Sequence, residues 1–179
     1  MNKVKKMTNN KFNIQILLGQ LESSLKNTIA ERKINDPVMI GIHTGGVWIA
    51  EKMHQRLNIV APLGVLDISF YRDDFSQIGM NPKVKPSQLP INTLEGRDII
   101  LIDDVFYTGR TIRAALNEIF DYGRPRQVLL GVLLERDGRQ IPMKPDCVGE
   151  TITLPPNQRV KLIEPEDLKV HIETINQAA

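Results

Sequence analysis

The order of hydrophobic and polar positions predicts an amphipathic helix near the start of the chain. Its apolar residues are three or four positions apart, which places them on one face of a helix. They are Ile14, Leu17, Leu18, Leu21, Leu25 and Ile29. The pattern stops before the pair Asp36-Pro37, where we expect the helix to have ended.

Further along the chain, short apolar runs alternate with helical patterns. The runs predict strands at residues 38–42, 63–70, 99–103 and 127–134. The helical patterns cover residues 47–57 and 111–122. Nearly continuous apolar strands are typical of a parallel sheet that is buried on both faces. We therefore predict an α/β fold, with a central parallel sheet and helices on both faces.

Two segments interrupt this alternation. Residues 71–92 are polar, contain three prolines and show little periodicity. A long irregular segment inside a compact domain is usually a functional loop or a disordered one, so a passive insertion stays open as the alternative. Residues 135–156 are charged, rich in proline and poorly periodic.

Composition narrows the class of protein only slightly. A chain of 179 residues suits one domain, and the net charge of +2 gives no sign of a polyanionic partner. The single cysteine cannot form an internal disulfide, which fits a reducing compartment. The apolar stretches are too short to cross a bilayer, and the basic first residues are not followed by a signal sequence. We expect a cytoplasmic protein that makes no membrane contact.

Residues 98–111, with the sequence DIILIDDVFYTGRT, carry the most informative motif. An apolar strand leads into two acids, then a turn with hydroxyl groups and a glycine, then a helix. The first N–H groups of a helix lack intrahelical partners and attract anions, so the turn is suited to a monoester phosphate. Asp103 and Asp104 are suited to accept hydrogen bonds from two vicinal sugar hydroxyls, directly or through a divalent cation. Paired acids can also be plain helix caps, but the complete string makes that alternative much weaker.

This motif resembles the phosphoribosyl-diphosphate (PRPP) motif of type I phosphoribosyltransferases. Residues 66–74 and 122–125 extend the similarity to the PyrR family of bifunctional pyrimidine-operon regulators and uracil phosphoribosyltransferases. The resemblance covers nearly the whole chain and implies the type I phosphoribosyltransferase fold as a single domain, 1–179. It also implies a hood at roughly 135–160 and a lid loop at roughly 71–92. The implied reaction converts uracil and PRPP to UMP and diphosphate in a homo-oligomer, with UMP-dependent regulation of pyrimidine genes as a second role.

The motif and the resemblance together assign site residues. The catalytic residues are Asp103, Asp104 and Arg72, and the two acids would also hold the Mg²⁺ that accompanies PRPP. Phosphate binding falls to Tyr107, Thr108, Gly109, Arg110 and Thr111. Diphosphate binding falls to Thr44, Gly45 and Gly46, base binding to Arg136 and Val148, and the lid to Tyr71 and Arg72. Regulators of the family commonly carry arginine where Gly45 stands, so this chain has one charge fewer for diphosphate.

Three other functions stay open. A 6-oxopurine phosphoribosyltransferase is disfavoured because those enzymes have an aromatic residue at the position of Cys147 and an acid at that of Tyr107. An RNA-binding attenuation regulator with little catalysis would need the same phosphate site, and so would a subunit that only binds nucleotide.

The resemblance also implies a surface for pyrimidine leader RNA. Basic residues of this kind are Arg32, Arg139 and Lys144. However, Asn27 and Glu150 occupy positions where the RNA-binding members carry a histidine and a lysine. Because phosphate contacts supply much of the affinity for RNA, we expect this chain to bind RNA weakly.

Overall fold

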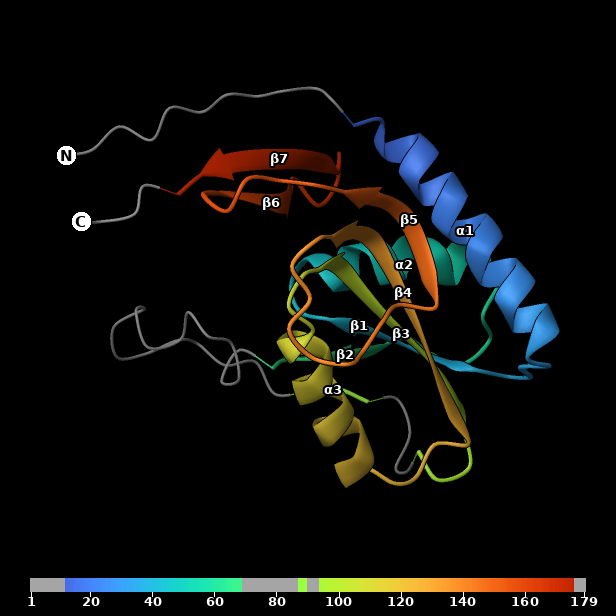
Figure 1. Cartoon of the computed structure of the whole chain (residues 1–179). Coiled ribbons are helices and arrows are strands. Elements are labelled where there is room, and N and C mark those ends of the chain that lie inside the picture. The colour runs from blue at the N-terminus through green and yellow to red at the C-terminus, as the bar shows by residue number, and fades with distance from the viewer. Residues whose placement is uncertain (1–11, 69–86, 90–93, 176–179) are drawn as a thin grey trace.

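The computed structural model describes residues 12–68, 87–89 and 94–175, and helices alternate with strands through most of them (Figure 1). The elements are α1 (Ile14–Glu31), β1 (Val38–Ile42), α2 (Gly45–Arg56), β2 (Gly64–Leu66), β3 (Asp98–Phe106), α3 (Arg110–Asp121), β4 (Gln127–Arg136), β5 (Cys147–Ile152), β6 (Gln158–Ile163) and β7 (Lys169–Thr174). No helix within these residues is long and apolar enough to cross a membrane.

Five parallel strands form the central sheet, in the order β2-β1-β3-β4-β5. Gly41 of β1 lies opposite Ile102 of β3, so the turn that follows β1 comes level with the carboxyl half of β3. Ligands of parallel α/β sheets bind at the carboxyl ends of the strands. The predicted α/β fold is therefore confirmed, and its topology places the two predicted anion-binding turns at one edge.

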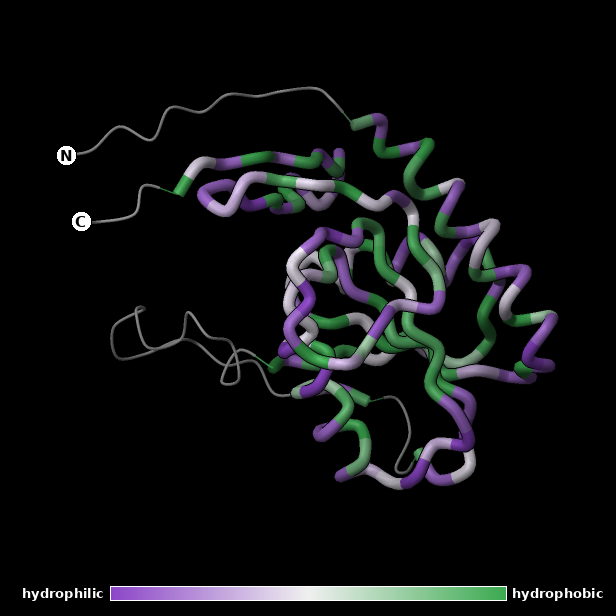
Figure 2. The backbone as a smooth tube through the Cα atoms, in the orientation of Figure 1, coloured by the Kyte–Doolittle hydropathy of each residue, from purple (hydrophilic) through white to green (hydrophobic). Residues whose placement is uncertain are grey.

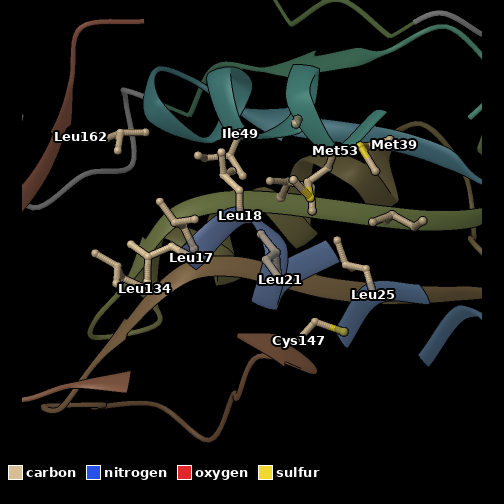
Figure 3. Close-up of a cluster of buried hydrophobic side chains, with 14 of the residues drawn as sticks. Leu17, Leu18, Leu21, Leu25, Met39, Ile49, Met53, Leu134, Cys147 and Leu162 are labelled. Carbon is tan, nitrogen blue, oxygen red and sulfur yellow. The ribbon is translucent and has the colours of Figure 1, made fainter. Parts of the chain in front are cut away.

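Two hydrophobic cores cover the two faces of the sheet. On one face, α1 and α2 pack through fully buried side chains, including Leu18, Leu21 and Met53 (Figure 3). On the other face, α3 packs through Ile112 and Ile119. The strands between the two cores consist mainly of hydrophobic residues, whereas polar residues occur along the outer side of the helices (Figure 2). Burial on both faces explains why the strands lack polar alternation.

The predicted helices occur with small shifts at their ends. Asn13 caps α1, because its side-chain oxygen accepts hydrogen bonds from the N–H groups of Gln15 (3.0 Å) and Ile16 (3.3 Å). Strand β3 differs more, because it continues through Phe106 instead of ending at residue 103. Val105 and Phe106 are apolar and pair with β4, which extends the strand. The two acids consequently lie within a strand rather than at its end.

A buried acid fixes the amino end of β3. Asp98 is 4% exposed and accepts hydrogen bonds from the backbone N–H of Asn35 (3.2 Å) and the side-chain amide of Gln127 (3.3 Å), and it pairs with Arg126. Burial acts to raise the pKa of Asp98, but these three hydrogen bonds outweigh it and hold the pKa below its ordinary value. This network lies at the opposite end of β3 from Asp103 and Asp104.

The hood is an antiparallel hairpin formed by β6 and β7, and it is a separate two-stranded sheet (Figure 1). Val160 and Leu162 of β6 and the nearby Leu168 join the core under α1 and α2, which attaches the hairpin to the domain. Strand β5, which we expected within the hood, is the fifth strand of the central sheet. The hairpin spans residues 158–174, and the predicted hood range of 135–160 overlaps it only at its start.

Candidate active site

The turn after β1 packs directly on the two acids of β3. A Cβ atom added at Gly45 would overlap the carboxylate of Asp104 and lie 2.6 Å from its Cγ atom. One added at Gly46 would lie 2.7 Å from the carbonyl oxygen of Ile102 and 2.9 Å from Cα of Asp103. Gly46 meets backbone atoms, so this position requires glycine for the turn to approach β3 this closely. At Gly45 a side chain would instead have to displace the side chain of Asp104.

Helix α2 begins inside this turn and brings its amino end beside Asp104. Thr44 is the N-cap residue, and its side chain makes no capping hydrogen bond. Its hydroxyl lies 2.8 Å from Nδ1 of His43 instead. The first N–H groups of α2 and the positive end of its dipole are therefore suited to an anion such as diphosphate.

A cavity of about 270 Å³ opens between this turn, β3 and the hood. The turn and α2 contribute Thr44, Gly45 and Trp48, β3 contributes Asp104 and Val105, and β6 contributes Val160, Lys161 and Leu162. Its walls thus combine apolar side chains with a carboxylate, an ammonium group and a helix amino end. Such a mixture suits a ligand that has both a planar apolar part and charged groups.

The two adjacent acids have different surroundings. Asp103 is 2% exposed, and its Oδ1 accepts a hydrogen bond from the N–H of Asp104 at 3.0 Å. Asp104 is half-buried and lines the cavity. Neighbouring side chains of a strand point to opposite faces, so the two carboxylates do not form a matched pair. Asp104 is consequently the acid that is better placed to reach a ligand.

The predicted phosphate loop leads from β3 into α3. Gly109 is the N-cap residue of α3 and has a φ of +90°, a left-handed conformation that favours glycine. The hydroxyl of Thr108 accepts a hydrogen bond from the N–H of Arg110 at 3.3 Å. The helix begins at Arg110, one residue before the predicted start. Thr108, Gly109, Arg110 and Thr111 thus surround the amino end of a 12-residue helix, as an anion site requires.

The connection between β4 and β5 packs on this phosphate loop. The N–H of Gln140 donates to the carbonyl oxygen of Thr108 at 3.1 Å. The side chain of Ile141 lies so close to Gly109 that an added Cβ would be 2.7 Å from its Cγ1 atom. Nothing in the irregular pattern of residues 137–146 indicated this contact.

The predicted base-binding residues lie differently from what we expected. Arg136 is 6% exposed, and its terminal nitrogens donate to three backbone carbonyls between residues 154 and 158. Val148 is half-buried and packs with the core on the α3 face. The structure thus gives neither residue a place in the cavity wall, and Tyr71 and Arg72 lie outside the described residues.

The argument from Cys147 was wrong. Its side chain is fully buried beneath α1, as Figure 3 shows, and its thiol donates to the hydroxyl of Thr28 at 3.3 Å. Cys147 is therefore part of the core, and the lack of an aromatic ring at this position carries no information about the base. Tyr107, the second residue of that argument, is 40% exposed.

The three basic residues that we linked to RNA are all exposed. Arg32 forms an ion pair with Asp146, which neutralises part of its charge. Arg139 donates to the carbonyl oxygen of Met143 at 3.4 Å. Glu150 is also exposed and lies on β5.

The acids at the cavity fit a cation that arrives with its ligand. No group of three or more His, Cys, Asp or Glu side chains that could hold a metal ion occurs within the described residues. Mg²⁺ often binds through one or two carboxylates together with the phosphate oxygens of a substrate. Asp104, with Asp103 next to it, suits that second kind of site.

Sequence reasoning missed five residues that line the cavity, namely Trp48, Val105, Val160, Lys161 and Leu162. The position of Val105, directly after the two acids, is a signal that could have identified it. Lys161 and Leu162 reach the cavity because the hairpin folds back over the sheet, a tertiary contact with no local sequence signal.

Proteins with similar sequences share this organisation over almost their whole length. The phosphoribosyl transferase domain model matches residues 10–162. A Nitrosococcus oceani protein named Bifunctional protein PyrR is 55% identical over 167 residues, which cover 92% of this chain and 94% of that protein. A protein of the same name from Pseudomonas syringae is 50% identical over 90% of this chain and 95% of its own length.

Solved structures of more distant proteins share the fold. A Staphylococcus aureus hypoxanthine phosphoribosyltransferase has a TM-score of 0.66 and 18% identity, covering 99% of this chain and 98% of its own. A Trypanosoma cruzi hypoxanthine phosphoribosyl transferase has a TM-score of 0.66 and 15% identity, covering 98% and 95%. At these identities the likeness concerns the fold alone. Together with the family model and the similar sequences, it shows that the chain belongs to the PyrR family of type I phosphoribosyltransferases.

Proposed function

We propose that this protein is a uracil phosphoribosyltransferase that forms UMP and diphosphate from uracil and PRPP. One observation carries the proposal: two helix amino ends lie at one edge of the sheet, and one of them lines a cavity together with the carboxylate of Asp104. PRPP has a phosphate at one end, a diphosphate at the other and a sugar with two hydroxyls between them. The site offers matching groups in the same order.

Each part of PRPP then has its own binding segment. The backbone of residues 108–111 at the start of α3 holds the 5′-phosphate, and residues 44–46 at the start of α2 hold the diphosphate. Asp104 accepts hydrogen bonds from the ribose hydroxyls, and the buried Asp103 fixes the backbone of Asp104 through its 3.0 Å hydrogen bond. Anchoring both ends of the substrate lowers the orientational cost of the reaction.

Charge separation defines the chemical step. The bond between the anomeric carbon and diphosphate breaks, the diphosphate leaves with the bonding electrons, and positive charge develops on the sugar. In this proposal the carboxylate of Asp104 stabilises that charge, and a pre-oriented charge of this kind typically contributes a large part of catalysis. Bound Mg²⁺ would supply charge neutralisation for the diphosphate. N1 of uracil forms the new bond to the anomeric carbon and gives up its proton to the departing diphosphate or to solvent. The apolar side chains of Val105, Val160 and Leu162 exclude water from one side of the site.

Base specificity is tested by a direct comparison. We expect the purified protein to form UMP from PRPP and uracil, and to form no nucleotide from hypoxanthine or guanine under the same conditions. The product is measured by chromatography with a radiolabelled base. Nucleotide formation from a purine base alone would contradict the proposal and favour the 6-oxopurine alternative.

A regulatory role is the second proposed function, since the similar proteins are named as bifunctional. The exposed cations Arg32, Arg139 and Lys144 would contact the RNA backbone, but the Arg32–Asp146 ion pair and Glu150 weaken the positive field. We propose that pyrimidine leader RNA binds weakly. The measurement is a titration with leader RNA in the presence of UMP at physiological salt. Nanomolar, sequence-specific binding that UMP strengthens would contradict weak binding and make attenuation the main role.

We further propose a homo-oligomer in the cytoplasm. The proposal of oligomerisation rests on the family to which the chain belongs, and it is tested by sedimentation velocity over a range of protein concentrations.

A further inference from the structure

Arg136 is a charged residue that is buried in the protein. It is the last residue of β4, and only 6% of it is exposed to solvent. Burying a guanidinium group costs free energy unless it has partners. Its partners here are carbonyl oxygens and an aromatic ring, and no carboxylate within the described residues forms a salt bridge with it. Its Nε atom is buried, and none of the described residues forms a hydrogen bond with it.

One side of Arg136 holds the start of the hood. Nη1 donates to the carbonyl oxygen of Gln158 at 2.7 Å, and Nη2 donates to that of Pro155 at 3.1 Å. A third, longer contact of 3.5 Å joins Nη2 to the carbonyl oxygen of Leu154. Gln158 is the first residue of β6, and the cavity wall begins two positions later at Val160. The guanidinium therefore fixes the backbone from which the hood wall of the cavity extends.

The other contact of Arg136 is with the phosphate loop. Its Cζ atom lies 4.3 Å from the centre of the ring of Tyr107, a cation–π contact. The same ring packs so closely on Gly138 that an added Cβ atom there would overlap it. Tyr107 comes directly before Thr108 in the phosphate loop and three positions after Asp104. One side chain thus touches both the loop expected to bind phosphate and the hood.

We infer that Arg136 is a positioning residue for the transfer reaction, fixing the hood wall of the cavity relative to the phosphate loop through Tyr107. This inference rests on the proposed function for its kinetic test. Lysine would keep the charge but lose the planar fork that reaches several carbonyls and stacks on a ring. The relative position of phosphate and base would then become less well defined, and small misplacements of reacting groups reduce rates strongly.

The test is a double-mutant cycle on Arg136→Lys and Tyr107→Leu. We expect each single change to lower kcat/KM for uracil on the order of tenfold to a hundredfold. The kcat/KM of the double variant should be no lower than that of the less active single variant, because both changes break the same contact between Arg136 and Tyr107. Tyr107→Phe keeps the ring and should therefore retain a higher kcat/KM than Tyr107→Leu. Arg126→Lys is the matched control, since Arg126 pairs with Asp98 at the far edge of the sheet, and it should leave kcat/KM unchanged.

Several outcomes would overturn the inference. The two residues would act separately if Arg136→Lys had the kcat/KM of the wild type. The same conclusion would follow if the losses of kcat/KM in the two single variants multiplied in the double variant. If Arg136→Lys does not fold, equal kcat/KM for Tyr107→Phe and Tyr107→Leu would contradict it. If the wild type forms no UMP, the proposed function fails instead, and the same cycle is read from the Kd for UMP by calorimetry. Coupled losses of UMP affinity would then support the link, and independent losses would refute it.

Discussion

Two acids of the same strand allow a direct separation of catalysis from stability. Asp104 lines the cavity, whereas Asp98 is buried at the other end of β3. The substitution of aspartate by asparagine keeps the size of either side chain and removes its charge. We expect Asp104→Asn to lower turnover with little loss of stability, and Asp98→Asn to do the reverse.

The magnitudes follow from the surroundings of each acid. Losing one pre-oriented charge in an active site typically costs about a hundredfold in rate, or about 2.7 kcal/mol. Asp98 loses charge-assisted hydrogen bonds from three groups, and such bonds contribute about 1.5 to 3 kcal/mol. The side chain of Arg126 is 51% exposed, so solvent screens its part and we expect the lower end of that range. That loss would lower the Tm by about 3 to 8 °C in a chain of this size.

The assay measures UMP formation and urea unfolding on the same three preparations: wild type, Asp104→Asn and Asp98→Asn. A loss of turnover in both variants, in proportion to their loss of stability, would show that Asp104 acts through the fold. Wild-type turnover in Asp104→Asn would refute its assignment to the reaction. Unchanged stability in Asp98→Asn would show that its three hydrogen bonds contribute little net free energy.

Three further predictions follow from the same contacts. Gly45→Ala should reduce turnover at least tenfold, because the new Cβ overlaps the carboxylate of Asp104. A steady-state assay that finds a normal KM for PRPP and a normal kcat would contradict the packing of this turn. The pKa of Asp98 is lower in the folded protein than in the unfolded chain. The stability that ionised Asp98 contributes is therefore complete above its unfolded-state pKa, near 3.8, and is lost as the pH falls through its folded-state pKa. The stability difference between wild type and Asp98→Asn in urea should therefore shrink below about pH 4, and a constant difference down to pH 2 would count against it. Deleting residues 81–86 of the predicted lid should lower kcat while the Tm stays within a few degrees, and equal kcat would make the segment a passive insertion.

Local chemistry explains which parts of the fold the sequence predicted. The apolar spacing of α1 and the continuous apolar runs of β1, β3 and β4 are set by burial, so their approximate ranges were predictable. The anion-binding turns were predictable because a helix amino end, glycine and hydroxyl residues occur together in the sequence. The end of β3 was not, since a pair of acids normally favours a turn and only pairing with β4 overrides that preference.

Tertiary contacts explain what the sequence could not predict. Arg136 was assigned to base binding, but its environment depends on the hood carbonyls that fold back over it. Cys147 was compared with a base-stacking position, yet its burial depends on the packing of α1 across β5. The adjacent acids seemed equivalent because the alternation of a strand became relevant only once β3 was seen to continue past them.

Gly45 and Asp104 have to be considered together. An arginine at the position of Gly45 would add a positive charge for diphosphate. In this structure any side chain at residue 45 must displace the carboxylate of Asp104. The absence of a charged side chain at residue 45 is therefore linked to a carboxylate that lies beside the amino end of α2. Backbone N–H groups and a cation that arrives with PRPP must then balance the negative charge of diphosphate next to Asp104. Diphosphate affinity in this chain should accordingly depend more on Mg²⁺ than on any side chain of the turn after β1.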